Sequence, residues 1–524
     1  MLAPPAHAQL QPDTGTTAQV GGLRQQLEGL LAPGGGPSTA PDWTIVPALG
    51  IEQRWTDHLE EAGGSGNAAF ITALLPSVLI NGQTLRSSTI VAYSPALQYY
   101  SDNGDQNRIT QNLNAISRLT LVPELLFLDL RAFAAMQPIN GGTGPGSTVA
   151  VARQSETQAM SFSVHPYLRE RFGDLGFAEL GATVSHTSQD ALSTGGTTGS
   201  GQSLFSQQEY LLLKSGPDLG RTSIALSITA GQGAGAGAIN DSSSDEAKLS
   251  LGYAITRSIT ALASLGYDTL HYGGTPPYNQ AGIEWSAGLR WEPNADSSIV
   301  ATYGRQDGVD SAQLNASYAP TARTRVYARY SEGIITGPEQ LLNAMDASAL
   351  DPSGNPIGLD NGTPQQIVNS FYSVQSYLAL VTSASVTAVL LQDRDSFSAS
   401  LGRQERHQLA AATTATTGPQ DYTGLYGSLN WQHDLRPNLR SFLFAQWGTT
   451  QSSSAGQSSP AGSSQNYDTL VFSLHLSYSI SETLTAYAQY SWTNRGEQAV
   501  TGAAGTLPGY LPTNLIIIGA RKTF

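Results

Sequence analysis

The chain has 524 residues, and charged residues make up only 13% of it, about half the share that is usual in soluble globular proteins. Glycine (55 residues) and long stretches of Ser, Thr, Asn and Gln take the place of the missing charge. Cysteine is absent, which excludes disulfides, thiolate metal sites and cysteine nucleophiles. The net charge of −14 disfavours nucleic acid as a partner, because phosphate binding needs clustered Lys and Arg.

The first eight residues, MLAPPAHA, resemble the end of a cleaved signal peptide, because Ala6, His7 and Ala8 fit the small-x-small cleavage pattern. This pattern predicts export to the periplasm or beyond. We expect residues 9–42, which are rich in Gly and Pro, to form a flexible periplasmic leader. Within it, residues 22–31 (GLRQQLEGLL) are a candidate short helix.

From residue 43 onward, apolar and polar residues alternate with period 2, which is typical of β-strands. In GIEWSAGLRW, Ile283 and Trp285 fall on one face, whereas Glu284 and Arg290 fall on the other. The longest apolar stretches are shorter than the roughly 20 residues of a membrane-spanning helix. If the chain crosses a membrane, it must therefore do so as strands.

Short turns and long loops alternate along this region. Tight turns are predicted at residues 122–124, 172–174, 216–220, 255–257, 293–296, 319–322, 393–395, 435–437 and 480–482, and longer loops near 138–155, 189–202, 233–243, 336–381, 409–418, 450–464 and 497–510. Outer-membrane barrels have short periplasmic turns and long extracellular loops, and a closed barrel satisfies every backbone group in lipid. The pattern predicts an all-β fold in which residues 43–524 form a single-chain transmembrane antiparallel β-barrel in the bacterial outer membrane. We expect about 22 strands, within a range of roughly 18 to 24.

Charged residues on the face opposite the apolar one are predicted to face the lumen, because a charge on the lipid face costs roughly 2–4 kcal/mol at mid-membrane. These lumen candidates are Arg118, Asp129, Arg131, Arg169, Glu284, Arg290 and Arg329. Such side chains would line a polar conduit, or they would pair across neighbouring strands and fill the barrel. The sequence leaves both arrangements open.

The longest loop, residues 336–380, contains two stretches of helical character, GPEQLLNAMD and TPQQIVNSFYSV, with Pro338 and Pro364 near first-turn positions. The pattern slightly favours an external, solvated loop. Because wide barrels are plugged in known proteins, the alternative is that the loop folds inward as a plug or constriction. It would then present Glu339, Asp346, Asp351 and Asp360 to the pore.

No arrangement of residues predicts catalysis, so we expect a protein that is not an enzyme and that holds no cofactor or metal. The eight histidines are scattered without metal-ligand spacing. The glycine-rich stretch at residues 231–238 precedes a strand, whereas a phosphate-binding loop precedes a helix.

Five stretches carry a family resemblance: WTIVPALGIEQRWTDH, AAFITALLPSVLINGQTLRSSTIVAYSPALQYYS, QNLNAISRLTLVPELLFLDLRAFAAMQ, LDPSGNPIG and DRDSFSASLGRQER. Together they resemble the outer-membrane β-barrel family associated with PEP-CTERM and exosortase systems. The resemblance covers most of the chain from about residue 43. It implies a role in exopolysaccharide production or export, and it supplies no catalytic residues.

The leading hypothesis is a porin-like channel or assembly component for the export or passage of exopolysaccharide or other polar solutes. The alternative is a non-conducting structural or docking protein whose long loops bind surface glycan or partner proteins. A ligand-gated active transporter also uses about 22 strands, but a plug domain needs more than the leader of about 34 residues. The expected partners are outer-membrane lipids and lipopolysaccharide, the barrel-assembly machinery and polysaccharide export proteins.

The chain ends on NLIIIGARKTF, whereas the termini of soluble domains are usually polar. A terminal aromatic residue is typical of the last strand of outer-membrane barrels, where the assembly machinery reads it. Gly519 and Phe524 are therefore the candidate assembly-signal residues. Lys522 departs from the pattern, because an aromatic or apolar residue is usual at that place.

Overall fold

The computed structural model describes residues 43–59, 68–101, 104–138, 156–189, 193–194, 197–198, 202–235, 237–274, 276–350, 355–358, 377–410, 420–454, 464–500 and 511–524. The predicted signal-peptide end, the leader, Asp351 and Asp360 lie outside these residues. No helix in the described ranges is long and apolar enough to cross a membrane.

The described chain is almost entirely β-strand. The strands of the main sheet are β1 (Trp43–Thr56), β2 (Ala69–Gln83), β3 (Ser87–Tyr93), β4 (Ala96–Tyr100), β5 (Arg108–Thr110), β6 (Leu113–Val122), β7 (Leu126–Pro138), β8 (Glu156–Arg171), β9 (Gly176–Gln189), β12 (Gln202–Ser215), β13 (Thr222–Gly235), β14 (Ser242–Ala254), β15 (Ile259–Tyr272), β16 (Tyr278–Trp291), β17 (Ser298–Gln306), β18 (Val309–Thr321), β19 (Thr324–Thr336), β22 (Leu378–Gln392), β23 (Asp395–Ala410), β24 (Gln420–Arg436), β25 (Leu439–Ser454), β26 (Ser464–Ser479), β27 (Leu484–Val500) and β28 (Leu511–Thr523). The remaining pieces are the helix α2 (Gly337–Asp346), the short strands β10 (Ser193–Thr194), β11 (Thr197–Thr198), β20 (Ser348–Leu350) and β21 (Pro356–Gly358), and the 3-10 turns η2 (Gly104–Gln106), η4 (Pro217–Leu219) and η5 (Gly237–Ile239).

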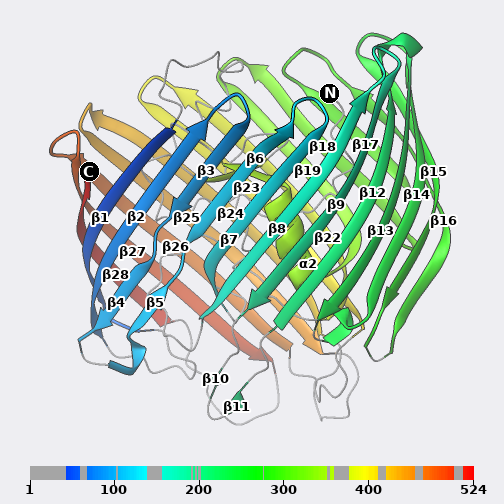
Figure 1. The fold of residues 1–524 in the computed structure, drawn as a ribbon. Coiled ribbons are helices and arrows are strands. Elements are labelled where there is room, and N and C mark those ends of the chain that lie inside the picture. Colours follow the sequence, from blue (N-terminus) through cyan, green and yellow to red (C-terminus); the bar gives the residue numbers. More distant parts are fainter. Residues whose placement is uncertain are drawn as a thin grey trace.

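The main sheet closes on itself as a barrel (Figure 1). Each strand pairs antiparallel with the next along the chain, and β28 pairs with β1. β3 and β4 both pair with β2 and together form one interrupted span. On their other side, β3 pairs with β6 and β4 pairs with β5, so β5 and β6 together form the next interrupted span. The barrel therefore has 22 strands, as the sequence predicts.

The outer face is apolar and the inner face is polar. On β16, Ile283, Trp285 and Leu289 are 64%, 43% and 52% exposed, whereas Glu284, which points inward, is 2% exposed. In water such a continuous apolar surface would be a large liability, but it suits the hydrocarbon of a membrane. The predicted alternation is thus confirmed, and it assigns the lipid face and the lumen face of each strand.

Few residues separate consecutive strands at one end of the barrel, and mostly more residues separate them at the other. The nine predicted tight turns lie within about three residues of their expected positions, and a further one at residues 84–86 was not predicted. At the long-loop end, β17 and β18 are joined by only Asp307 and Gly308, both with positive φ (52° and 78°). Glycine favours this conformation, which matches the twist of a hairpin. By the rule for outer-membrane barrels, the end with the short turns is the periplasmic end.

The barrel closes between the first and last strands, where Tyr487 on β27 reaches across β28. Its ring lies over Gly519, and its hydroxyl donates a hydrogen bond to the Glu52 carboxylate on β1. A Cβ atom at position 519 would lie 2.5 Å from the ring. Glycine at this position therefore has a packing reason, and a role in an assembly signal stays a prediction.

Phe524 directly follows β28, and its backbone N–H donates a 2.9 Å hydrogen bond to the Pro47 carbonyl. Its side chain points outward and is 70% exposed, with Lys522 Nζ 5.9 Å from the ring centroid. Because the ring makes little contact with the rest of the barrel, we expect deletion of Phe524 to slow membrane assembly in cells far more than it lowers the stability of protein already folded. The measurement is the folded, heat-modifiable fraction after pulse labelling, compared with urea unfolding of the purified protein. Normal assembly without Phe524 would show that the terminal signal lies elsewhere.

Candidate functional site

Helix α2 begins at a well-formed N-terminus. Thr336 is the N-cap, Pro338 occupies the first turn, and the Glu339 carboxylate accepts hydrogen bonds from the Thr336 backbone N–H (2.9 Å) and hydroxyl (2.7 Å). This capping arrangement satisfies backbone groups that would otherwise lack partners. Glu339 also accepts a 2.9 Å hydrogen bond from the Tyr272 hydroxyl on β15. Glu339, predicted to face the pore, is therefore occupied in holding the start of the helix.

The helix lies inside the barrel and packs against its wall (Figure 1). Leu341, Leu342, Ala344 and Met345 form a buried cluster with Phe133 on β7 and Ala159 on β8. The external placement that the sequence slightly favoured is therefore wrong for the described part of the loop up to Leu350. Its apolar helix face is the physical reason, because burying it against the wall removes that face from water.

Arg131 holds the C-terminal end of the helix. Its Nη1 atom donates hydrogen bonds to the carbonyls of Met345 (2.9 Å), Asp346 (3.0 Å) and Ser348 (2.7 Å), and its Nε lies 4.0 Å from the Asp346 carboxylate. The last carbonyls of a helix have no partners within it and carry a partial negative charge, so a guanidinium is well suited to them.

The helix is also held from other parts of the ring. Arg406 on β23 donates a hydrogen bond to the Gln340 side chain, and Tyr272 on β15 bonds Glu339. In the strand order, β7, β15 and β23 are far apart around the barrel. Helix α2 is therefore tied to different sides of the lumen rather than resting on one wall.

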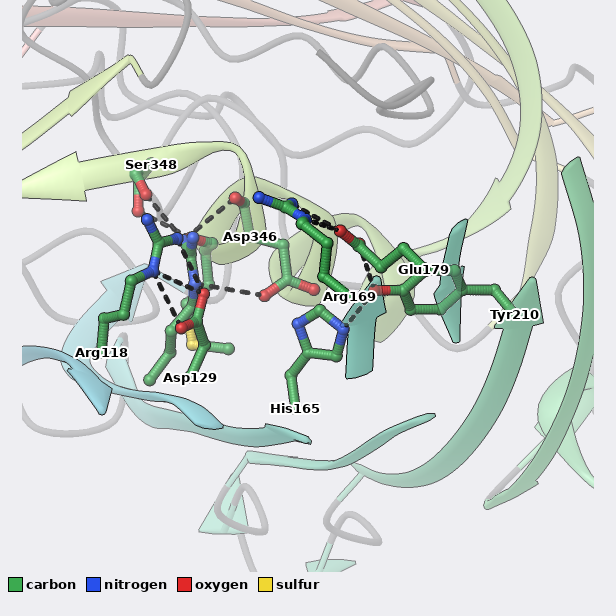
Figure 2. Close-up of polar contacts among 10 residues, drawn as sticks. Arg118, Asp129, His165, Arg169, Glu179, Tyr210, Asp346 and Ser348 are labelled. Carbon is green, nitrogen blue, oxygen red and sulfur yellow. Dashed lines mark hydrogen bonds and ion pairs between the residues drawn. The ribbon is translucent and has the colours of Figure 1, made fainter. Parts of the chain in front are cut away.

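Next to the Arg131 anchor lies a wall of paired charges (Figure 2). Arg118 bonds Asp129 through Nε (3.0 Å) and Nη2 (2.8 Å), and Arg169 Nε bonds Glu179 at 2.7 Å. Each pair joins neighbouring strands. This is the predicted arrangement in which the charged lumen residues pair with one another and fill the barrel. Arg131 differs, because it bonds the helix instead of a neighbouring strand.

The same wall carries a chain of three hydrogen-bonding side chains (Figure 2). The Tyr210 hydroxyl donates to Glu179 Oε1 at 2.7 Å, and His165 Nε2 lies 2.9 Å from the same hydroxyl. The Tyr210 hydroxyl has one proton, which it donates to the Glu179 carboxylate. Its oxygen therefore accepts the second hydrogen bond, and His165 Nε2 is the donor. The tyrosine ring lies over Gly181, where a Cβ atom would come within 2.5 Å of it.

The remaining lumen candidates lie away from this wall. The Glu284 carboxylate lies 3.1 Å from Lys248 Nζ, which also contacts Glu246 at 3.3 Å. Arg290 follows Glu284 on the same inner face of β16, and Arg329 lies on β19. The structure thus brings Arg118 and Asp129 together, and it separates them from Glu284, Arg290 and Arg329.

Several functional candidates were not predicted, namely His165, Glu179, Tyr210, Lys248 and Arg406. All of them follow the same alternation as the predicted residues, so counting along each strand from an assigned neighbour would have found them. Among the described residues, no group of three or more His, Cys, Asp or Glu side chains is placed to hold a metal ion.

Asp346 has an altered acidity because of its position at the end of α2. Enclosure within the barrel raises the pKa of Asp346 to about 6, whereas Arg131 and the 3.5 Å hydrogen bond from Ser163 act in the opposite direction. The Asp346 side chain is 42% exposed. Its pKa is therefore raised by the protein walls that surround it within the barrel, and not by atoms packed directly against the carboxyl group.

We expect docking of α2 to depend on pH through Asp346. The docked helix favours the neutral carboxyl, so docking is strongest below the ordinary pKa of 3.8, weakens as the pH rises to about 6, and then stays constant. Asp346→Asn stays neutral and should keep the low-pH docking strength at all pH values. Hydrogen exchange of the α2 amides between about pH 4 and 8 measures this. An unchanged pH dependence in Asp346→Asn would assign it to another group.

Comparison with known proteins gives a fold but no family. No protein-family model matches the chain, and no curated protein matches it in sequence. Among solved structures, the FrpB iron transporter from Neisseria meningitidis (F5-1 variant) has a TM-score of 0.51 at 10% identity, covering 95% of this chain and 84% of that one. Its apoprotein form has a TM-score of 0.51 at 11% identity, covering 98% and 86%.

Both similar structures are of a transporter and not of an enzyme, and at these identities the likeness concerns the fold alone. The closed ring of 22 strands and its apolar outer face agree with that fold. The chain is a bacterial outer-membrane β-barrel.

Proposed function

We propose that this barrel is a passage for polar solutes across the outer membrane and that helix α2 narrows it. The observation that carries the proposal is the helix inside the ring, anchored by Arg131, Tyr272 and Arg406 from separate strands. A segment held across a lumen restricts what passes, whereas an external docking loop would leave the lumen unaffected.

The inner wall is mostly polar, which favours a passage for polar solutes. On β23 to β27 the inward side chains are mostly hydroxyls and amides, including Ser398, Asn430, Gln446, Ser473 and Gln489. Hydroxyl and amide groups exchange hydrogen bonds with water and with sugars, and they carry no charge that would hold a solute tightly. The resemblance to barrels associated with exosortase systems makes exopolysaccharide the candidate cargo, and iron compounds, suggested by the similar transporter, are the other cargo to be tested.

The test is ionic conductance in planar bilayers, with the purified full chain and with a variant that lacks residues 338–378. We expect measurable conductance in the full chain and a clear increase after the deletion. Heat-modifiable gel migration must show that both proteins are folded. If both proteins are folded and neither conducts ions, the proposed passage is disproved. The alternative, a non-conducting docking protein, is then the better hypothesis.

A further inference from the structure

The inner wall carries a ring of basic side chains at the periplasmic end. Its members are Arg171, Lys214, Arg290, Arg325 and Arg521, and we call this set the mouth ring. Each lies within two residues of the periplasmic end of its strand, namely β8, β12, β16, β19 and β28. The strand order places these five strands around the barrel rather than on one side.

Contacts and alternation show that these side chains face inward. Lys214 Nζ lies 6.0 Å from the centroid of the Phe177 ring, which also stacks under Arg169. Arg521 donates a 3.1 Å hydrogen bond to the Ser77 hydroxyl. Both contacts are made on the lumen side of the strands, opposite the exposed apolar residues.

The other members are placed by their neighbours on the strand. Arg290 stands between Leu289 and Trp291, which are 52% and 47% exposed on the lipid face. Arg325 pairs in register with Val389, which is 1% exposed and belongs to a buried cluster on the inner wall. Arg171 continues the inward alternation of Tyr167 and Arg169.

Basic side chains outnumber carboxylates on the inner wall at this end. Among the described residues, the inward carboxylates near it are Glu52, Asp129, Glu179 and Asp434, which contact Arg54, Arg118, Arg169 and Arg440. These four arginines are not members of the ring. The turns beyond the strands carry charges of both signs, such as Arg257 and Glu292. The excess of positive charge is therefore found on the inner wall and not in the turns.

Acidic residues dominate elsewhere, since the whole chain has a net charge of −14. Inside the barrel, Glu246, Asp268 and Glu284 lie on β14 to β16 around a single cation, Lys248. This acidic patch lies on one wall, whereas the residues of the mouth ring come from strands distributed around the barrel. The periplasmic opening is therefore lined by basic side chains, although the protein as a whole is acidic.

From this placement we infer that the periplasmic mouth selects anions and that the solute passing through the barrel carries anionic groups, such as the carboxylates of an acidic polysaccharide. The inference rests on the proposed passage. A ring of Lys and Arg side chains attracts anions because it raises the local electrostatic potential at a narrow opening. An anionic glycan arriving from the periplasm would meet this ring first.

The test is the zero-current potential of the full chain in a planar bilayer with a KCl gradient. We expect chloride to be preferred over potassium by about threefold, because focused surface charge raises the local concentration of counter-ions and the salt screens much of this effect. The variant K214Q/R290Q/R325Q should bring this ratio close to unity. The matched control R305Q/R403Q/K522Q removes the same charge from the outer face and should leave the ratio unchanged.

A second measurement uses a polymer and needs no variant. A polygalacturonate oligosaccharide, added to each side in turn, should block the current from one side, whereas an uncharged dextran of equal length should not. Absence of any conductance would count against the passage itself. Conductance with a potassium preference, or equal block by both polymers, would overturn the anion inference while the passage stands.

Discussion

Gly519→Leu should prevent the barrel from closing. Any side chain at this position would meet the Tyr487 ring, since a Cβ atom alone would lie 2.5 Å from it. The ring would have to leave, and with it the hydrogen bond from Tyr487 to Glu52 that crosses the final strand. Overpacking of a well-packed site typically costs about 1–3 kcal/mol and occasionally more, so we expect a strong loss of heat-modifiable, urea-resistant protein.

Two variants separate this packing effect from a general sensitivity to larger residues. Gly333→Ala on β19 places its Cβ atom in open space, so it should be tolerated. The double variant Gly519→Ala with Tyr487→Ala removes the obstructing ring and should be more stable than Gly519→Ala alone. If Gly519→Leu matches the original protein in the urea titration, the closing strands do not depend on this contact.

Arg131→Ala should release the end of helix α2 and increase the ionic conductance. The guanidinium donates hydrogen bonds to three carbonyls, and it is only 14% exposed. Hydrogen bonds to charged groups contribute about 1.5–3 kcal/mol each when they are counted singly. Because the three share one nitrogen atom, we expect their joint loss to lower the equilibrium constant for docking by roughly 10- to 100-fold.

The matched control is Arg118→Ala, on the neighbouring strand of the same wall. Arg118 pairs with Asp129 and has no hydrogen bond to α2 among those described, so its loss should leave the helix docked. Hydrogen exchange of the α2 amides and single-channel conductance should change together in Arg131→Ala. Faster exchange without higher conductance would mean that the helix does not limit the passage.

Local patterns explain why so much of the barrel could be predicted. The alternation that places Trp285 outward and Glu284 inward is visible in a few residues, and a tight turn fixes the register of its two strands. Arg118 and Asp129 are nearly equidistant from the turn at residues 123–125, so their pairing follows from the hairpin. The start of α2 was also predictable, since Pro338 marks its first turn.

The anchoring of α2 could not be predicted in this way. Arg131 is one of several inward arginines, and nothing near it in the sequence distinguishes the one that meets a helix. Arg406 and Gln340 meet across the lumen, so their contact depends on the curvature of the whole ring and not on any strand register. The inward placement of the loop was missed for the same reason, because its binding surface on β7 and β8 is distant in sequence.

The contact between Arg131 and the Met345 carbonyl joins residues 214 positions apart. A helix of 10 residues is too short to persist alone in water, so α2 forms stably only when its wall is present. Bringing together residues so far apart in the sequence closes a long loop, and the entropic cost of this closure grows with loop length. Such contacts therefore form later than those within a local hairpin. The contacts that hold α2 come from β7, β15 and β23, so they are complete only after these separate strands are in place. A newly inserted barrel would therefore pass through a leaky stage before it matures.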